Sequence, residues 1–468
     1  MNGPSKIDMA CSKFGMVLLC ILMMDCCIFG AGRIVSAGPI SFRMGILALL
    51  ILTAIPLIFS QWKKLIHDKY LWFLLAFIVW LVIATLIGIT NSNRKSLIIT
   101  DLKGFAYFSF LPAAICILNS KERIHILMKC MMYASGFLAL FTCFLLCSYL
   151  WFSDFFFAFH DFAFPLQVSA FSSISTKIPR LFFKSDLYLL CGCAFAAYFQ
   201  IISASKKIQW RYIAITALCL FALLMTYTRS IYLAALVAAG GILFFFFCFT
   251  KKEMHRRFLT HLGAAVALFL VIVGIFSFSG KANYLGYAIM RSTISEIDEP
   301  TSSNPQNDSS GSVSSNPAQN IEEEMQNHYL ELTRKSDQIR YETRQQLYEG
   351  IKNSPIIGNG LGAEIEIRPD GLNEYFYLDL LYKAGIIGLL LYLIPLIGMC
   401  IYLIRSFKKS NDNKLRISAW LAILLGFLSF SWFNPYMNAA LGILFYCCVI
   451  AVFSLVDKDK LTDGKGKR

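Results

Sequence analysis

Long runs of apolar residues alternate with short polar segments along almost the whole chain. A helix needs about 20 apolar residues to cross the hydrocarbon core of a bilayer, and by that criterion the chain has about twelve candidate spans. They cover residues 14–33, 41–60, 70–90, 104–118, 126–151, 186–204, 211–227, 230–249, 261–280, 378–404, 415–433 and 437–456. The pattern therefore predicts an all-α, polytopic integral membrane protein with about twelve transmembrane helices.

Composition also indicates a membrane protein and argues against a soluble domain. Hydrophobic residues make up 57% of the 468 residues and charged residues only 15%, whereas soluble domains have about 25% charged residues. Most of the 15 cysteines lie inside apolar runs, where cysteine behaves as a small hydrophobic residue, so we expect neither a zinc site nor a disulfide framework. Residues 11–33 have an apolar core but no clear small-residue cleavage site, which favours a first membrane helix over a signal peptide.

The distribution of positive charge predicts the orientation of the chain. The net charge is +14, but lysine and arginine gather in short clusters between the apolar runs, which indicates membrane orientation and not a nucleic-acid partner. Counting from a cytoplasmic N-terminus, every even-numbered connection is basic, and the third connection is the one mild exception. We therefore expect both termini in the cytoplasm and three segments outside it: residues 151–186, the turn at Arg229 and residues 281–372.

On this topology the chain divides into three parts. Residues 1–280 carry the first nine helices, and residues 281–372 form a large extracytoplasmic loop between helices 9 and 10. Residues 373–468 carry the last three helices and a basic cytoplasmic tail. Any chemistry in the loop is therefore expected outside the cytoplasm, where nucleotide sugars are absent.

The large loop is predicted to have two halves. Residues 301–320 are rich in Ser, Asn and Pro and are expected to be disordered or a flexible linker. Residues 321–353 are predicted to be helical, with Ser336 and the following Asp337 at a candidate N-cap and Pro355 beyond the end.

Two arginines lie where the outer ends of apolar helices meet polar residues. Arg229 is in the turn TYTRS between two spans, and Arg180 follows the helix-breaking Pro179 before another span. One interpretation is that both side chains reach for the lipid headgroups, because arginine at membrane depth is costly without a partner or water. The alternative is that both face a cavity and bind an anion, since the guanidinium fork matches phosphate oxygens.

Arg340 and Arg344 are four residues apart and therefore share one face of the predicted loop helix. The simpler interpretation is that they are solvated. The helix leads into the segment SPIIGNGLG, however, whose three glycines permit a tight backbone path close to a ligand. This glycine pattern follows a helix and not a strand, so it is no dinucleotide fingerprint.

Glu374 stands at the outer mouth of the tenth apolar span, beside Asn373 and an aromatic run that includes Tyr375 and Tyr377. An acid is favoured at a helix N-terminus by the helix dipole, and tyrosines are common at membrane interfaces. The other interpretation is that Glu374 is a general base that takes a proton from an attacking hydroxyl. Asn373, Tyr375 and Tyr377 would then contact a glycan.

Two stretches together resemble a known signature. IRYETRQQLYEGIKNSPIIGNGLG, followed by NEYFYLDLLYKAGIIGLLLYL, is similar to the pattern of the O-antigen ligase/O-antigen polymerase superfamily of bacterial membrane glycosyltransferases. The positions that fall on the pattern are Arg340, Pro355, Gly358, Gly360, Gly385 and Gly388. TYTRS resembles the family's T-x-S-R turn, and Arg180 resembles the arginine that precedes the span before that turn. The recognisable motifs cover residues 177–393.

The resemblance implies an enzyme of the bacterial cytoplasmic (inner) membrane that joins glycans on its outer face without a cofactor or metal. It implies a polyprenyl-pyrophosphate-linked oligosaccharide as donor, another lipid-linked repeat unit as acceptor, and inversion at the anomeric carbon. Arg180, Arg229 and Arg340 would stabilise the charge on the leaving pyrophosphate with Arg344 in support, and Glu374 would be the base. A chain-length regulator is a further candidate partner.

One departure bears on the branch of the family. Ligases carry a His–Asn pair at the start of the tenth span, where this sequence has Glu374 and Tyr375. An acid there is similar to the polymerase branch, so we predict a repeat-unit polymerase for O-antigen, capsule or exopolysaccharide. The alternatives are a ligase that moves finished glycan to lipid A core or to a protein, and a lipid-glycan transporter or flippase. For a transporter, inverted repeats and charges near the bilayer centre are expected, but no repeat is visible and Asp25 is a lone candidate.

Overall fold

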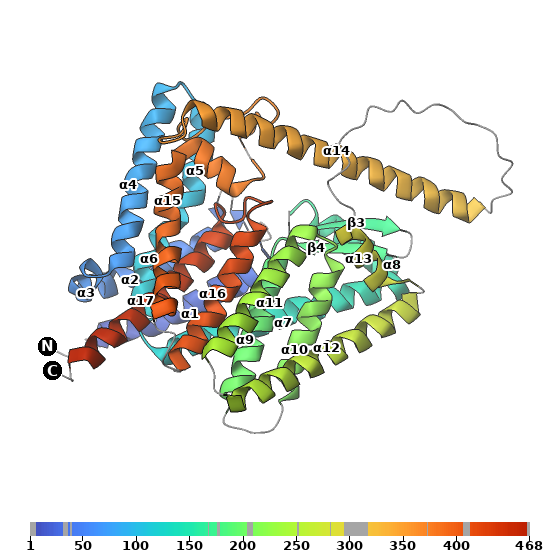
Figure 1. The fold of residues 1–468 in the computed structure, drawn as a ribbon, viewed down its shortest axis with the longest axis horizontal. Helices are drawn as coiled ribbons and strands as arrows, with labels where there is room; N and C mark the ends of the chain where they lie inside the picture. The colour runs from blue at the N-terminus through green and yellow to red at the C-terminus, as the bar shows by residue number, and fades with distance from the viewer. Residues whose placement is uncertain are drawn as a thin grey trace.

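The computed structural model describes residues 6–30, 36–37, 40–166, 168–175, 178–203, 209–249, 252–280, 282–293, 317–371, 373–405 and 412–465. The expected linker lies outside these ranges as far as residue 316. Helices dominate the described residues (Figure 1). The first ten are α1 (Lys6–Ile28), α2 (Phe42–Ser60), α3 (Trp62–Ile66), α4 (Lys69–Thr90), α5 (Lys95–Phe105), α6 (Leu111–Ile117), α7 (Lys121–Trp151), α8 (Ser153–Ala163), α9 (Leu189–Ile202) and α10 (Trp210–Met225). The others are α11 (Arg229–Phe249), α12 (Lys252–Gly280), α13 (Tyr284–Thr293), α14 (Pro317–Asn353), α15 (Phe376–Arg405), α16 (Asp412–Phe430) and α17 (Ala440–Lys465).

Short elements complete the fold. Two 3₁₀ helices, η1 (Ala106–Phe110) and η2 (Asp186–Tyr188), lead into α6 and α9. β1 (Ser36–Ala37) pairs with β2 (Ile40–Ser41), and β3 (Ser169–Ser175) pairs with β4 (Ile178–Phe183), both antiparallel. The β3–β4 hairpin was not expected in an all-α fold.

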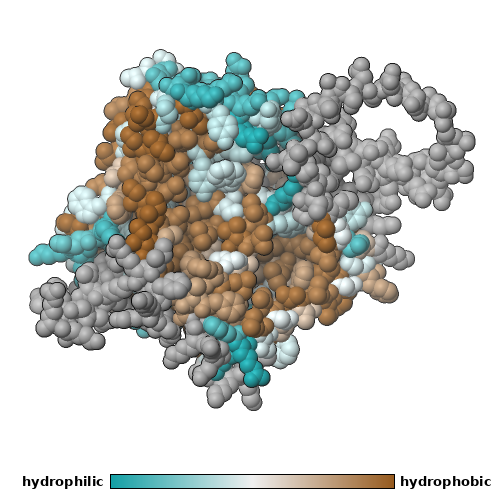
Figure 2. All heavy atoms as spheres, viewed as in Figure 1, coloured by the Kyte–Doolittle hydropathy of each residue, from teal (hydrophilic) through white to brown (hydrophobic). Residues whose placement is uncertain are grey.

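The membrane class predicted from the apolar runs is confirmed. Eight helical segments are long and apolar enough to cross a membrane: α1, α2, α4, the run Lys95–Ile117, α7, α11, Met254–Gly280 in α12 and Phe376–Leu403 in α15. Three shorter apolar helices, Asp186–Ile202, Trp210–Met225 and Ala440–Val456, occupy further expected spans. Hydrophobic side chains cover much of the side of the helices, with polar residues above them around α14 (Figure 2). The count of twelve spans stays a prediction.

The segment between α13 and α15 contains a longer helix than expected. α14 begins at Pro317, inside the predicted linker, and forms the long helix across the top of Figure 1. Ser336 therefore lies in the middle of α14 and is not its N-cap. The reason is local composition, since the residues before Ser336 include Glu, Gln, Met and Leu, which favour a helix.

α15 is interrupted at Gly385, which has φ 65° and ψ −176°. The segment between α14 and α15 supplies partners for the backbone groups around this break. The amide of Ile386 donates to the Pro355 carbonyl at 2.9 Å, and the amides of Asn359 and Gly360 donate to carbonyls of α15 at 2.8 and 3.0 Å. Such partners are needed because an unpaired backbone group costs several kcal/mol away from water.

The glycines of this segment fit against protein backbone. The amide of Leu361 donates to the Ala84 carbonyl of α4 at 2.9 Å. Gly358 and Gly360 both have positive φ, and a Cβ on Gly360 would collide with the backbone of Gly88. The close approach that the sequence interpretation assigned to a ligand is thus made to α4 and α15.

Gly360→Ala is expected to destabilise the protein. A side chain in this left-handed conformation costs about 1–3 kcal/mol even without the collision against α4. Thermal unfolding in detergent should occur at a lower temperature than for the natural chain. Gly240→Ala in α11, where a Cβ would meet nothing within 4 Å, is the matched control. Equal stability of the two variants would contradict the packing role of Gly360.

Candidate functional site

The turn between α10 and α11 holds Arg229 in a fixed position. Tyr227 is buried and has φ 44°, a strained conformation for an aromatic residue. The side chain of Thr226 donates to the Leu223 carbonyl at 2.8 Å, which closes the end of α10. Strain of this kind is found at functional sites where surrounding contacts maintain it.

Arg180 lies on β4 and braces that same turn. Its Nε donates to the Thr226 carbonyl and its Nη2 to the Thr228 hydroxyl, both at 3.0 Å. Its guanidinium also lies over the ring of Phe182, 5.5 Å from the centroid. The unexpected hairpin therefore brings Arg180 next to the Arg229 turn.

Arginines and carboxylates alternate in a row that joins the start of α11, α14 and the segment before α15. Arg229 Nη2 lies 3.4 Å from Asp337 Oδ2, and Asp337 Oδ1 lies 3.6 Å from Arg340 Nη1. Arg340 Nε lies 2.6 Å from Glu374 Oε2, and Glu374 Oε1 lies 2.7 Å from Arg368 Nη2. Three guanidinium groups and two carboxylates leave one net positive charge.

These side chains are neither fully buried nor fully solvated. Their exposed fractions range from 26% for Arg229 to 41% for Arg340. An ion pair with this exposure contributes about 1 kcal/mol or less. A more highly charged anion can therefore compete with either carboxylate for the arginines, because phosphate accepts two hydrogen bonds from one guanidinium.

The pKa of Arg340 lies above its ordinary value. Burial alone would lower it, but the hydrogen bond from Arg340 to Glu374 and the charges of Glu374 and Asp337 outweigh burial. Arg340 is therefore a permanent cation on α14.

Glu374 precedes the first residue of α15, and both of its carboxylate oxygens accept hydrogen bonds from arginines. Both oxygens of Glu374 therefore face arginines in the free protein. The role as a general base, expected from the sequence, stays a prediction.

Arg368 and Asp337 complete the row, and sequence reasoning did not assign either of them to the site. Arg368 precedes Glu374 by six residues in the segment between α14 and α15, so its positive charge close to Glu374 in the sequence was the available signal. Asp337 was interpreted only as part of a helix start. Its position three residues before Arg340 on one helix was the signal that mattered.

The remaining predicted residues make contacts outside this row. Arg344 lies over the ring of Tyr341 on its own helix, 5.5 Å from the centroid. The hydroxyl of Tyr377 donates to the Leu428 carbonyl at 2.8 Å. Tyr375 is 8% exposed and belongs to a small apolar cluster that joins α14 to α15.

Asn373 also lies apart from the row, although it is adjacent to Glu374. Its Nδ2 donates to Asp379 Oδ1 at 2.6 Å. The structure thus brings together Arg180, Arg229, Arg340 and Glu374 of the predicted site residues. Within the described ranges no group of three or more His, Cys, Asp or Glu side chains could hold a metal ion.

The comparison with protein families agrees with the sequence motifs. Residues 214–393 match the family model described as O-antigen ligase. This range contains Arg229, Arg340 and Glu374 and ends eight residues after Gly385. No curated protein matches the chain.

The row of charges should hold α14 against the start of α15. Glu374→Gln and Arg340→Ala are each expected to increase amide hydrogen exchange in the C-terminal half of α14, because each removes an ion pair between the two segments. Arg344→Ala is the matched control, since the contact of Arg344 with Tyr341 lies within α14. Exchange that is unchanged in all three variants would show that the ion pairs do not secure the helix.

Proposed function

We propose that the chain, of which residues 214–393 match the O-antigen ligase family model, is a polysaccharide repeat-unit polymerase of the O-antigen ligase/O-antigen polymerase superfamily. The donor is a glycan on a polyprenyl pyrophosphate. The acceptor is a hydroxyl of another lipid-linked repeat unit. The reaction takes place at the outer face of a multi-pass bacterial inner membrane protein.

The convergence of arginines from three separate segments supports this proposal best. Arg229 begins α11, Arg340 lies on α14, and Arg368 lies in the loop before α15, yet two carboxylates link them into one row. Preorganised cations around a leaving group usually give the largest catalytic contribution. A diphosphate would replace Asp337 and Glu374 as the partner of Arg229 and Arg340.

The same exchange would give Glu374 its role. Once the diphosphate holds Arg340, one carboxylate oxygen of Glu374 is released. The acceptor hydroxyl then attacks the anomeric carbon, and its proton passes to Glu374. The bond between that carbon and the diphosphate oxygen breaks, and its electron pair leaves with the diphosphate. A single displacement of this kind inverts the anomeric configuration.

The polymerase is favoured over the ligase by the residue at position 374. The resemblance implies a His–Asn pair at this place in ligases, and this chain has a carboxylate that is paired with two arginines. We also propose that both termini are cytoplasmic. In Figure 1 the end of α17 lies at the opposite side of the helices from α14, as this orientation requires.

Arg229→Ala and Glu374→Gln are expected to abolish glycan extension in cells. Loss of a charge-stabilising group or of a base reduces the rate by about 10²-fold or more. A deletion strain should be complemented with each variant and its surface glycan separated on a gel. Arg211→Ala, which changes an exposed arginine that contacts Gln209 and Tyr212, should restore full ladders.

The same gel distinguishes a polymerase from a ligase. Single repeat units on the acceptor indicate loss of a polymerase, whereas long chains stranded on the lipid carrier indicate loss of a ligase. Full-length ladders from both site variants at normal protein levels would refute the assignment of Arg229 and Glu374.

Chelation should leave the activity unchanged. Because arginines carry the charge of the leaving group in this proposal, membranes treated with EDTA are expected to extend lipid-linked glycan at the same rate as untreated membranes. The rate is measured from the lengthening of labelled lipid-linked product. A loss of activity that magnesium or manganese restores would contradict the metal-independent mechanism.

A further inference from the structure

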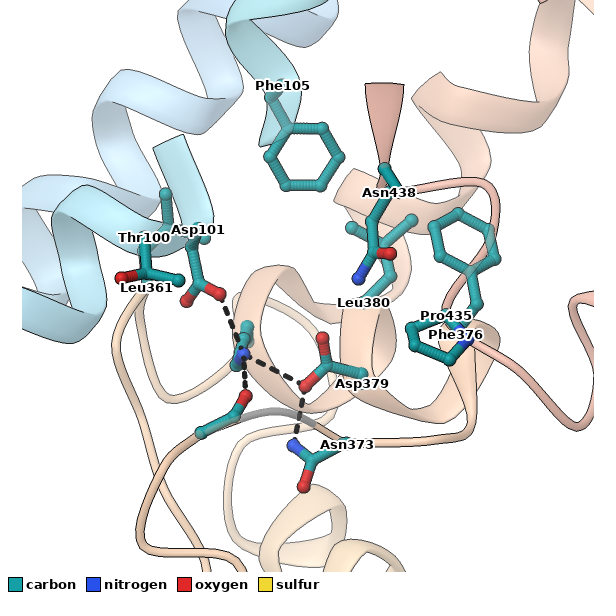
Figure 3. A pocket seen from close by; sticks show the side chains of 13 residues that line it. Thr100, Asp101, Phe105, Leu361, Asn373, Phe376, Asp379, Leu380, Pro435 and Asn438 are labelled. Atoms are coloured by element: carbon teal, nitrogen blue, oxygen red, sulfur yellow. Dashed lines mark hydrogen bonds and ion pairs between the residues drawn. The ribbon is translucent and has the colours of Figure 1, made fainter. Parts of the chain in front are cut away.

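A cavity of about 240 Å³ lies beside the start of α15. α5, α15 and the turn before α17 contribute its walls (Figure 3). The polar side chains that line it are Thr100, Asp101, Asn373, Asp379, Lys383 and Asn438. The cavity is partly open, and its volume is of the order of one sugar ring and not of an oligosaccharide.

A buried ion cluster forms one side of the cavity. The ammonium of Lys383 lies 2.9 Å from Asp101 Oδ1, 3.0 Å from Asp379 Oδ1 and 3.0 Å from the Gly371 carbonyl. These three contacts use all three donors of the ammonium. Lys383 therefore orients the two carboxylates and has no donor left for a ligand.

Other polar atoms of the cavity do remain available. Figure 3 shows that one oxygen of Asp379 binds Lys383 and Asn373 while the other carries no such contact among the residues drawn. Asn373 is 1% exposed, its Nδ2 donates to Asp379, and Figure 3 shows its Oδ1 pointing away from the other lining side chains. The free oxygen of Asp379 and the amide of Asn438 are therefore the groups of the lining that a ligand can reach.

The chemistry of the lining selects the class of ligand. Two carboxylates and one ammonium leave a net negative charge, which disfavours a phosphate. The rings of Phe105 and Phe376 add apolar surface to the hydrogen-bonding atoms. A ring of hydroxyl groups with apolar faces, that is a sugar, matches this combination of groups.

We propose that this cavity binds one sugar residue of the acceptor glycan. The inference rests on the proposed function, and it names the place from which the attacking hydroxyl comes. Asn373 lines the cavity while the next residue, Glu374, joins the arginine row. A sugar held by Asp379 and Asn438 would lie beside the segment that carries the proposed base, since Asn373 and Glu374 are adjacent in the chain.

The test uses the full-length protein in lipid nanodiscs and two probes. The first is a panel of methyl glycosides of glucose, galactose, mannose and N-acetylglucosamine, titrated by saturation-transfer NMR. The second is inorganic pyrophosphate, titrated by calorimetry. The variants are Asp379→Asn, Asn438→Leu and Arg229→Ala, and exposed Asn353→Leu at the end of α14 is the matched control.

At least one glycoside should bind the natural chain. Asp379→Asn and Asn438→Leu should each weaken this binding about tenfold, the effect of losing one hydrogen bond to the sugar. Arg229→Ala and Asn353→Leu should leave glycoside binding unchanged. Asn438→Leu keeps the inference testable if Asp379→Asn does not fold. The Asn438 side chain makes no hydrogen bond among the described residues, so its replacement removes no contact that holds the fold.

Two results would overturn the inference: no glycoside binds the natural chain, or Asn438→Leu binds as well as Asn353→Leu. Pyrophosphate reports separately on the proposed function, since Arg229→Ala should lose it and the cavity variants should keep it. Failure of pyrophosphate to bind, together with normal glycoside binding, would refute the arginine site while leaving the sugar site standing.

Discussion

Main-chain hydrogen bonds between the interrupted helix α15 and the segment that precedes it set the geometry of the candidate site. The amide of Ile386 reaches the Pro355 carbonyl beyond Gly385, and Leu361 reaches α4. This seam needs glycine at positions where a Cβ would meet backbone. Because α14 ends two residues before Pro355, the seam also determines where the arginine on α14 meets the carboxylate before α15.

The row of charges keeps three arginine side chains in fixed positions while they remain partly exposed. Asp337 and Glu374 hold the arginines in place without burying them completely. Partly exposed ion pairs are weak. In the proposed reaction, an anion could therefore replace Asp337 or Glu374 as the partner of an arginine at little cost in free energy. Glu374 is then both the partner of the arginines in the free protein and the group that substrate binding would release. The buried cluster around Lys383 lies on the other side of the same short segment.

Local patterns predicted the helices well and the site only in part. The apolar runs identified the helices because burial in a bilayer demands length and hydropathy. The family motifs drew attention to Arg229 and Arg340, and Glu374 was noticed as a carboxylate at the mouth of an apolar span. They could not show that α14 begins at Pro317, because the linker residues looked polar and irregular. The pairing of Arg368 with Glu374 could not be predicted, because it depends on the path of the irregular segment before α15 and not on helical spacing. The β3–β4 hairpin that carries Arg180 was missed because serine-rich strands give no apolar alternation.

A structure of the full-length protein with a polyprenyl pyrophosphate bound would test the arginine site most directly. We expect phosphate oxygens within hydrogen-bond distance of Arg229 and Arg340, with Glu374 separated from Arg340 and turned toward the cavity that Asn373 lines. A diphosphate bound elsewhere, with the pairs of Arg229 to Asp337 and Arg340 to Glu374 intact, would contradict this expectation.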